Sequence, residues 1–228
     1  MRTYFSAALL LGFAGILSAQ NASAPAPIPV PVEQEPLHHV VLRNDSIIVM
    51  HVVIPPGDRS LFHIHSHDRV AIELTTSPIT QQNLNEPEGP VTPTQPGELS
   101  IRTQAVAPLI HRVHNTGTAP FEVLDVELLQ RPQNPSSAVA TAVAAENPSA
   151  RVYKWILAPG ATTPMHTHER PYLIVSVTTL QLKMTGPDGK SLSDELKPGD
   201  FHWVDTKVTH SLSNEGPATG QLFEIELK

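Results

Sequence analysis

Cysteine is absent from the 228-residue chain, and aromatic residues make up only 5% of it. The lack of cysteine excludes disulfides, iron–sulfur clusters and zinc sites with thiolate ligands. It leaves imidazole and carboxylate groups as the strong metal ligands that the sequence can offer. Charged residues are also few, at 16%, with 15 basic and 22 acidic residues and no basic run. This balance argues against nucleic acid or an anionic membrane surface as a partner.

Long amphipathic helical patterns are also missing from about residue 37 onward. Short runs of Val, Ile, Leu and Thr alternate there with turns rich in Pro, Gly and Asn, a pattern typical of all-β domains. Proline reaches 23 residues, roughly twice the average usage of about 5%. Five prolines fall within residues 20–36, which we expect to form an extended linker. Five more fall within residues 77–97, where we expect a long loop.

The N-terminus has the pattern of a secretory signal peptide over residues 1–19. Arg2 supplies the positive start, and an apolar run over residues 7–17 has the length of a signal core. Small residues follow and offer cleavage after Ala19 or after Ala24. Because the run is short for a spanning helix, a cleaved signal is favoured over an uncleaved anchor. We therefore expect a secreted or periplasmic protein with no membrane segment beyond the signal.

One arrangement of histidines occurs twice. The two copies are Gly57-x5-His63-Ile64-His65 and Gly160-x5-His166-Thr167-His168, and His-x3-Asn patterns follow them at His111…Asn115 and His210…Asn214. Two histidines that alternate along a strand place both imidazoles on one face. A third histidine from a neighbouring strand can complete a three-nitrogen metal site. The predicted metal ligands are therefore His63, His65 and His111 in the first copy, and His166, His168 and His210 in the second.

The repeat extends beyond the histidines. The first motifs are separated by 103 residues, and residues 122–128 match residues 221–227 at a separation of 99. A repeat of this length predicts two tandem domains. The expected order is a signal peptide at 1–19, a linker at 20–36, a first domain at 37–130, a second linker at 131–150 and a second domain at 151–228. Within the second linker, residues 138–146 could form a short helix between prolines.

These motifs resemble those of the cupins, and the duplication resembles a bicupin, over nearly all of the mature length. The first cupin motif, Gly-x5-His-x-His-x3–4-Glu, is matched by Gly57, His63 and His65 and again by Gly160, His166 and His168. The second motif, which ends in His-x3-Asn, is matched in the second copy by Gly199, His210 and Asn214. The resemblance implies an all-β fold of two tandem antiparallel jelly-roll barrels (double-stranded β-helices), with a metal inside the barrel mouth.

The glutamate of the first cupin motif is missing from both copies, where Arg69 and Tyr172 stand at its position. Three histidines still make a workable site, because neutral imidazoles bind Zn, Cu, Fe and Ni, and open positions admit water or substrate. Arg69 would place a cation near the first site and lower its metal affinity unless it swings out. Tyr172 could donate a hydrogen bond to a substrate oxygen or to bound superoxide. It is the candidate catalytic residue, with ordinary packing as the alternative.

Other residues have weaker claims to a role. His67 and Glu73 share strand parity with the first pair of histidines, so either could reach the first site. The remaining histidines are interpreted as ordinary half-buried residues; they are His38, His39, His51, His114 and His202. Asn115 and Asn214 are expected to serve turns at strand ends. A degenerate cupin, whose histidines persist without metal, is the alternative to metal binding.

Three functions from different classes fit these features. The first is a dioxygenase-type enzyme that acts on a small enolisable organic substrate with a divalent transition metal (Fe, Mn, Ni, Cu or Zn). The second is a metal-dependent isomerase, lyase or hydrolase of a sugar or small acid. It would need a general base, but Glu169 and Asp205 are predicted to point away from the metal face. The third is a non-enzymatic protein that binds a small molecule or a metal. We favour the first, with a small molecule as partner and a monomer or homodimer as the assembly.

Overall fold

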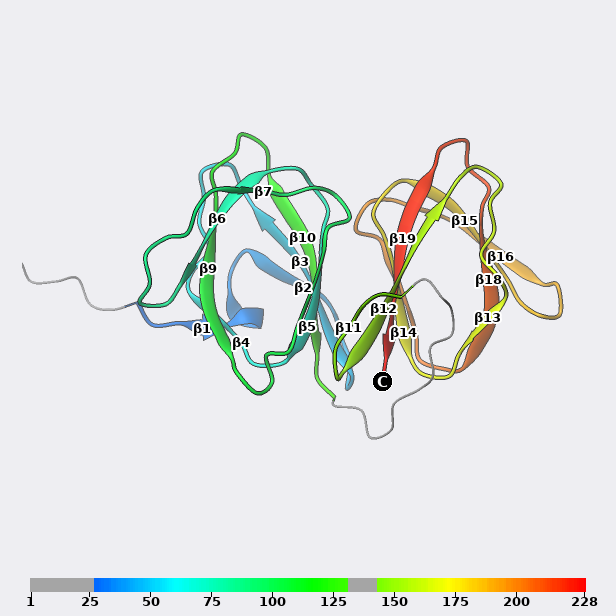
Figure 1. Ribbon diagram of the computed structural model, residues 1–228, viewed down its shortest axis with the longest axis horizontal. Coiled ribbons are helices and arrows are strands. Elements are labelled where there is room, and N and C mark those ends of the chain that lie inside the picture. Colours follow the sequence, from blue (N-terminus) through cyan, green and yellow to red (C-terminus); the bar gives the residue numbers. More distant parts are fainter. Residues whose placement is uncertain (1–26, 131–142) are drawn as a thin grey trace, which may run out of the picture.

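The structure is a computed structural model that describes residues 27–130 and 143–228. Within these ranges the chain forms β-strands, loops and one short 3-10 helix. Two β-barrels lie side by side, the first coloured from blue to green and the second from yellow-green to red (Figure 1). This architecture confirms the predicted all-β fold of two tandem jelly-roll barrels. No helix in the described part of the chain is long and apolar enough to span a membrane.

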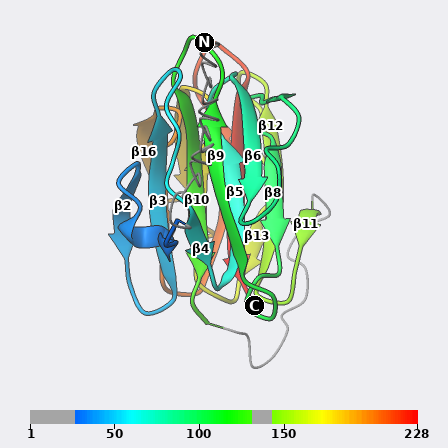
Figure 2. The same cartoon turned by 90° about the vertical axis from the view of Figure 1, so that its left-hand side faces the viewer.

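The first barrel consists of two five-stranded sheets, with the strand orders β1-β4-β9-β6-β7 and β2-β3-β10-β5-β8. Its elements are β1 (Val30–Pro31), the 3-10 helix η1 (Val32–Gln34), β2 (His38–Arg43), β3 (Ile47–Ile54), β4 (His63–His65), β5 (Asp68–Glu73), β6 (Pro78–Asn83), β7 (Thr92–Pro93), β8 (Leu99–Arg102), β9 (Leu109–Asn115) and β10 (Phe121–Leu128). The pairs are antiparallel except for β1 with β4, which is parallel. Figure 2 views this barrel from the side of β9 and β6.

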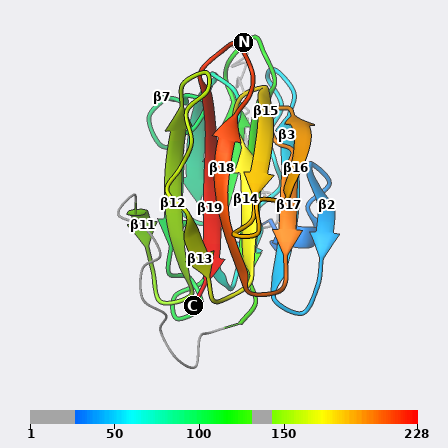
Figure 3. The ribbon, with the colours of Figure 1, turned by 90° about the vertical axis from the view of Figure 1, so that its right-hand side faces the viewer.

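The second barrel repeats the plan with a five-stranded sheet, β11-β12-β19-β14-β17, and a four-stranded sheet, β13-β18-β15-β16. Its elements are β11 (Val143–Glu146), β12 (Ala150–Leu157), β13 (His166–His168), β14 (Tyr172–Ser176), β15 (Leu180–Thr185), β16 (Ser191–Leu196), β17 (Phe201–Val204), β18 (Val208–Asn214) and β19 (Gly220–Leu227). Its strand pairs are antiparallel. The sheet with β18, β15 and β16 faces the viewer in Figure 3.

A single hydrophobic core joins the two barrels. It is formed by the facing five-stranded sheets, chiefly by β3, β5 and β10 of the first barrel and by β12, β14 and β19 of the second. Its buried members are Ile47, Val49, Val70, Ile72, Leu74, Leu124, Val126, Leu128, Ala150, Val152, Leu173, Val175, Val177, Phe223 and Ile225. Two further clusters fill the barrel interiors. The central strands are therefore buried on both faces.

Alternation along β10 and β19 directs acidic side chains into the barrels. Leu124 and Val126 of β10 join the core between the barrels, so Asp125 and Glu127, which alternate with them, lie on the opposite face, inside the first barrel. In β19, at a separation of 99 residues, Glu224 and Glu226 occupy the equivalent inward positions. All four carboxylates are buried.

The described part of the predicted linker at 20–36 is packed against the first barrel and is not a free extended arm. β1 adds to β4 at the edge of a sheet, and η1 follows it directly. Val32 is buried in the interior core of the first barrel, and Glu35 is also buried. The segment folds onto the barrel because Val32 is buried in the barrel core and the carboxylate of Glu35 forms hydrogen bonds there. The predicted signal peptide lies outside the described residues, so export stays a prediction.

Two other segments differ from their expected form. Val143–Glu146 form β11, which pairs with β12, instead of the end of a short helix; residues 131–142 lie outside the described ranges. The expected long loop at 77–97 contains β6, which pairs with β9. Proline does not prevent this strand, because Pro78 is its first residue, where the missing N–H disturbs the ladder least.

Candidate metal centre

Histidines from two neighbouring strands meet inside the second barrel. β13 carries His166 and His168 on one face, and β18 carries His210 directly opposite His166 in the antiparallel register. All three imidazoles are buried. A carboxylate from β19, Glu224, joins them, and the four ligand atoms lie within 4.8 Å of one another. The structure thus brings the three predicted ligands of the second copy together and adds an acidic one.

The distances within this group suit one metal ion. His166 Nε2 and His210 Nε2 are 3.0 Å apart. The carboxylate oxygens of Glu224 lie 3.2, 3.3 and 3.1 Å from Nε2 of His166, His168 and His210. Two donors that each lie about 2.1 Å from one ion are separated by roughly 3.0 Å at a right angle and roughly 3.4 Å at a tetrahedral angle. Three imidazoles and one carboxylate therefore fit a divalent transition metal in both chemistry and spacing.

Outer hydrogen bonds hold two of the imidazoles in the orientation that a metal requires. His166 Nδ1–H donates to the carbonyl oxygen of Pro164 at 2.8 Å. His168 Nδ1–H donates to the carboxylate of Glu226 at 2.6 Å. Both rings therefore direct Nε2 toward the centre of the group. Such partners set the tautomer of a metal-binding histidine and raise its basicity.

Trp155 supports the carboxylate side of the centre. Its indole Nε1–H donates to Glu224 Oε2 at 2.6 Å. The indole also stacks on the ring of His166, with 5.7 Å between centroids and 28° between planes. One tryptophan therefore restrains two members of the group.

Tyr172, the candidate catalytic residue, lies beside the centre. Its ring stacks on that of His168 at 4.0 Å between centroids and 16° between planes. Its hydroxyl lies 3.5 Å from His210 Nδ1. Burial, together with the nearby charge of Glu224, raises the pKa of Tyr172 above its usual value, so the hydroxyl keeps its proton and can donate.

The charges of the centre favour cation binding. Burial opposes ionisation of Glu224, but hydrogen bonds from the three histidines outweigh it and hold the pKa of Glu224 well below its ordinary value. For His168 burial acts against the charged form, yet the carboxylates of Glu224 and Glu226 raise its pKa to about 9. Burial lowers the pKa of His210. Without metal, His168 therefore carries a proton that a metal ion must displace.

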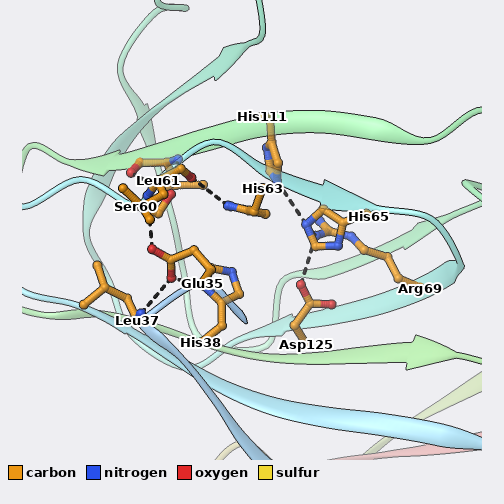
Figure 4. A network of polar contacts seen from close by, with 11 residues as sticks. Glu35, Leu37, His38, Ser60, Leu61, His63, His65, Arg69, His111 and Asp125 are labelled. Carbon is orange, nitrogen blue, oxygen red and sulfur yellow. Dashed lines mark hydrogen bonds and ion pairs between the residues drawn. The ribbon is translucent and has the colours of Figure 1, made fainter. Parts of the chain in front are cut away.

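The three predicted ligands of the first copy also come together, inside the first barrel (Figure 4). His63 lies opposite His111 in the register of β4 and β9. His65 Nδ1 lies 2.7 Å from Glu127 Oε1, as His168 does from Glu226 in the second barrel. Burial, and next the charge of His38, lowers the pKa of His63 to about 3. The imidazole arrangement is therefore duplicated along with its supporting carboxylate.

An ion pair distinguishes the first barrel from the second. Arg69 Nη1 lies 3.0 Å from Asp125 Oδ2 and 3.0 Å from His65 Nε2 (Figure 4). Asp125 is the counterpart of Glu224, and Arg69 is the counterpart of Tyr172. The predicted cation thus lies at the histidines and does not swing out, because it has a carboxylate partner within the barrel.

A cavity of about 40 Å³ adjoins this first-barrel group and is lined in part by Glu73. Glu73 does not join the histidine group, but one of its carboxylate oxygens is buried without a hydrogen-bond partner. Burial, and next the charge of Glu98, raises the pKa of Glu73 to about 8. Burial also raises the pKa of Glu127 to about 9, with Asp125 adding to the effect. The interior of this barrel therefore disfavours further negative charge.

The N-terminal arm reaches the same group. Glu35 accepts hydrogen bonds from the backbone N–H groups of Leu37 at 2.7 Å and Leu61 at 3.0 Å, and it pairs with His38 Nδ1 at 2.5 Å. The His38 ring packs on the ring of His63, with 4.6 Å between centroids. His38 is therefore fully part of the first-barrel interior and is not an ordinary half-buried residue.

The other histidines lie away from the two groups. His51 pairs with Glu122, His114 with Glu88 and His202 with Asp194, while His39 is exposed. His67 points its Nδ1 to Glu127 at 3.3 Å and is 41% exposed, so it is not a member of the first group. As expected, Asn115 and Asn214 serve turns: through Nδ2, each donates to the carbonyl oxygen of one loop residue and to that of the last residue of a strand.

Glu224 is the member of the second-barrel group that was not predicted from the sequence. It lies on the last strand, 14 residues after His210 and outside both histidine motifs. Its signal was the pair of acids at alternating positions, Glu224 and Glu226, in a stretch that is otherwise apolar from Leu222 to Leu227. The same signal recurs at Asp125 and Glu127, whose inward orientation depends on the strand register.

No family model matches the sequence, and no curated protein matches it. Solved structures match the fold. AerE from Microcystis aeruginosa is 15% identical with a TM-score of 0.61, covering 89% of this chain and 98% of that one. A cupin 2 conserved barrel domain protein from Leptotrichia buccalis is 9% identical with a TM-score of 0.54, covering 88% and 92%.

A third structural neighbour is a salicylate 1,2-dioxygenase from Pseudaminobacter salicylatoxidans. It is 13% identical with a TM-score of 0.55, covering 80% of this chain and 71% of that one. At these identities the likeness concerns the fold, and the two histidine groups come from this chain's own residues. With two jelly-roll barrels in tandem and these neighbours, the chain has the cupin fold in duplicate.

Proposed function

We propose that the protein is an exported, metal-dependent bicupin whose second barrel carries out dioxygenase-type chemistry on a small enolisable organic substrate. The observation that carries this proposal is the buried group of His166, His168, His210 and Glu224. Its donors would hold a divalent transition metal ion, with Fe, Mn, Ni, Cu and Zn as candidates. Such an ion, when bound, would supply Lewis-acid chemistry and, in the case of Fe, Mn, Ni or Cu, redox chemistry that can activate an enolisable substrate toward O2.

The surrounding residues support this class over a reaction that needs a free general base. Glu169 is exposed and pairs with Lys207 at 2.7 Å, and Asp205 is also exposed; both lie just after a strand. Glu224 is held by three imidazoles and an indole, so it is a ligand rather than a mobile base. Tyr172 keeps its proton and can donate a hydrogen bond to a substrate oxygen. A substrate that ionises readily, such as an enol, suits such a site.

A cavity of about 360 Å³ offers room for the substrate between the edge strands β16 and β17 of the second barrel. Its walls are mostly apolar and include Ile174, Met184 and Leu192. Ile174 lies two residues after Tyr172 on β14, and Met184 pairs with Leu212, two residues after His210 on β18. The wall is therefore close in sequence to Tyr172 on β14 and to His210 on β18, although neither residue lines the cavity itself. These positions favour a substrate with an apolar body and an acidic polar end.

Two alternative functions are compatible with the same group of three histidines and Glu224. A non-enzymatic bicupin would bind a small molecule or metal without turnover, and an isomerase, lyase or hydrolase would work without O2. Metal analysis of the purified protein separates metal binding from its absence. O2 uptake with enolisable substrates, measured for wild type and for His166→Ala/His168→Ala, then separates the classes. Turnover that continues without O2 would contradict the dioxygenase assignment.

A further inference from the structure

The first barrel contains its own buried cation at the histidine group. The Arg69 side chain comes from β5, is 14% exposed and reaches His65 Nε2 and Asp125 Oδ2 at 3.0 Å each (Figure 4). We propose that the guanidinium of Arg69 takes the place of a metal ion in the first barrel. The protein then binds one metal ion per chain, in the second barrel; this count rests on the proposed function, whereas the exclusion of metal from the first barrel does not.

The hydrogen bond from Arg69 occupies the lone pair that a metal would need. A guanidinium in a protein is always protonated and only donates. His65 Nε2 must therefore be the acceptor in this contact, which leaves the ring proton on Nδ1, facing Glu127 Oε1 at 2.7 Å. The tautomer is the one that a metal ligand requires, but the acceptor nitrogen is already in use. A metal ion could bind His65 only after the guanidinium had left.

The charges in the first barrel also oppose the binding of a metal ion. In the second barrel, Glu224 directs a carboxylate at the histidines, and the counterpart of Arg69 is the neutral Tyr172. In the first barrel, the carboxylate of Asp125 is already paired with Arg69. A divalent ion at His63, His65 and His111 would therefore lie beside a fixed positive charge whose counter-ion is shared. Like charges at such short range in a buried site oppose binding.

Arg69 cannot leave easily, because Asp125 depends on it. The Asp125 side chain is only 4% exposed, and its other carboxylate oxygen has no hydrogen-bond partner. Removing one member of a buried ion pair leaves an uncompensated charge, which is strongly unfavourable. The two copies therefore differ at two linked positions. The first barrel has Arg69 and Asp125 where the second barrel has Tyr172 and Glu224.

The test transfers the second-barrel pair into the first barrel. The variant Arg69→Tyr/Asp125→Glu is expected to bind two equivalents of Zn²⁺ or Co²⁺ per chain, against one for wild type, as measured by elemental analysis after dialysis. Addition of His63→Ala should return the count to one. The matched control Arg69→Lys keeps a cation and should stay at one. The visible spectrum of the Co²⁺ form reports nitrogen ligation at the new site independently of activity.

A second measurement uses the native first barrel. In the His166→Ala/His168→Ala background the protein should retain no stoichiometric metal, and Arg69→Tyr/Asp125→Glu should restore one equivalent. If that background still binds one equivalent that is lost with His63→Ala, the first barrel holds metal and the inference is wrong. A folded Arg69→Tyr/Asp125→Glu protein that gains no metal also overturns it. Absence of metal from the wild-type second barrel would instead contradict the proposed function.

Discussion

The indole of Trp155 and the carboxylate of Glu224 are joined by a hydrogen bond of 2.6 Å, and the same carboxylate faces three imidazoles. Trp155 thus orients the acidic member of the centre from outside. The first barrel has no indole at this position, because Val52 is the counterpart of Trp155 at a separation of 103 residues.

Trp155→Phe should weaken metal binding in the second barrel by about 10-fold, as losses of outer hydrogen bonds to metal ligands commonly do. The substitution removes the Nε1–H donor and keeps an aromatic ring against His166. Competition titration with a chromophoric chelator would measure the affinity. Trp203→Phe alters the other tryptophan of the chain and should leave the affinity unchanged. Equal affinities for wild type and Trp155→Phe would show that the indole contact does not orient Glu224.

Metal affinity should rise with pH. The pKa of His168 is raised to about 9, so the metal-free centre carries a proton there at neutral pH that binding must release. We expect the dissociation constant to fall about tenfold per pH unit between pH 6 and pH 8 and to level off above about pH 9. Calorimetry in buffers of different ionisation enthalpy counts the released proton. A flat profile over pH 6–8 would mean that His168 is already neutral before metal binds.

Glu73→Gln should stabilise the protein at alkaline pH. The folded state holds a proton on Glu73 up to about pH 8, whereas the unfolded chain releases it near the ordinary value of 4.5. The folded state therefore binds more protons in this window, and its stability falls as pH rises from about 4.5 to 8. We expect the variant to gain about 1–3 kcal/mol in free energy of unfolding at pH 8 and little at pH 5.

Urea denaturation at the two pH values measures this difference. Glu195→Gln, at an exposed position, serves as the control and should change the stability little at either pH. A gain for Glu73→Gln that is the same at pH 5 and pH 8 would mean that the carboxylate does not titrate abnormally.

Asn214→Ala and Asn115→Ala should destabilise the protein by similar amounts. Asn214 donates to the carbonyl oxygens of Leu157 and Ala218 and accepts from the N–H of Gly216. Asn115 makes the equivalent three bonds in the first barrel and also accepts one from the Ser77 hydroxyl at 2.7 Å. Loss of about three buried hydrogen bonds should cost about 2–3 kcal/mol at each site in thermal or urea unfolding. Gln130→Ala, an exposed amide, should cost far less, and a large difference between the two asparagines would contradict their equivalence.

The fold and the six histidines could be predicted because they depend on local spacing. A His-x-His pair on a strand places both rings on one face whatever the surrounding sheet does. Glu224 could not be assigned in the same way, because its approach to His210 requires the register of β19 against β12 and β14 in the opposite sheet. The partner of Arg69 escaped prediction for the same reason, since Asp125 belongs to β10.

Segment boundaries were predicted less well where composition and packing disagree. The segment 20–36 is rich in proline, yet its residues Val32 and Glu35 are buried against the first barrel. Proline content predicts an extended backbone, which a short edge strand also satisfies. β11 likewise lies in the segment 138–146, for which a short helix between prolines was considered, and pairing with β12 decided its conformation.

The hydrophobic core between the barrels gives the first copy a structural role that does not depend on any ligand. Each five-stranded sheet buries the apolar outer face of the other. A chain without the first barrel would therefore expose Val152, Val175 and Phe223 to water. Selection for solubility and stability would therefore retain the first copy even after its interior had changed. After gene duplication, one barrel can thus serve to stabilise the fold while the other carries the chemistry. The interior of the first barrel is then free to acquire a different function.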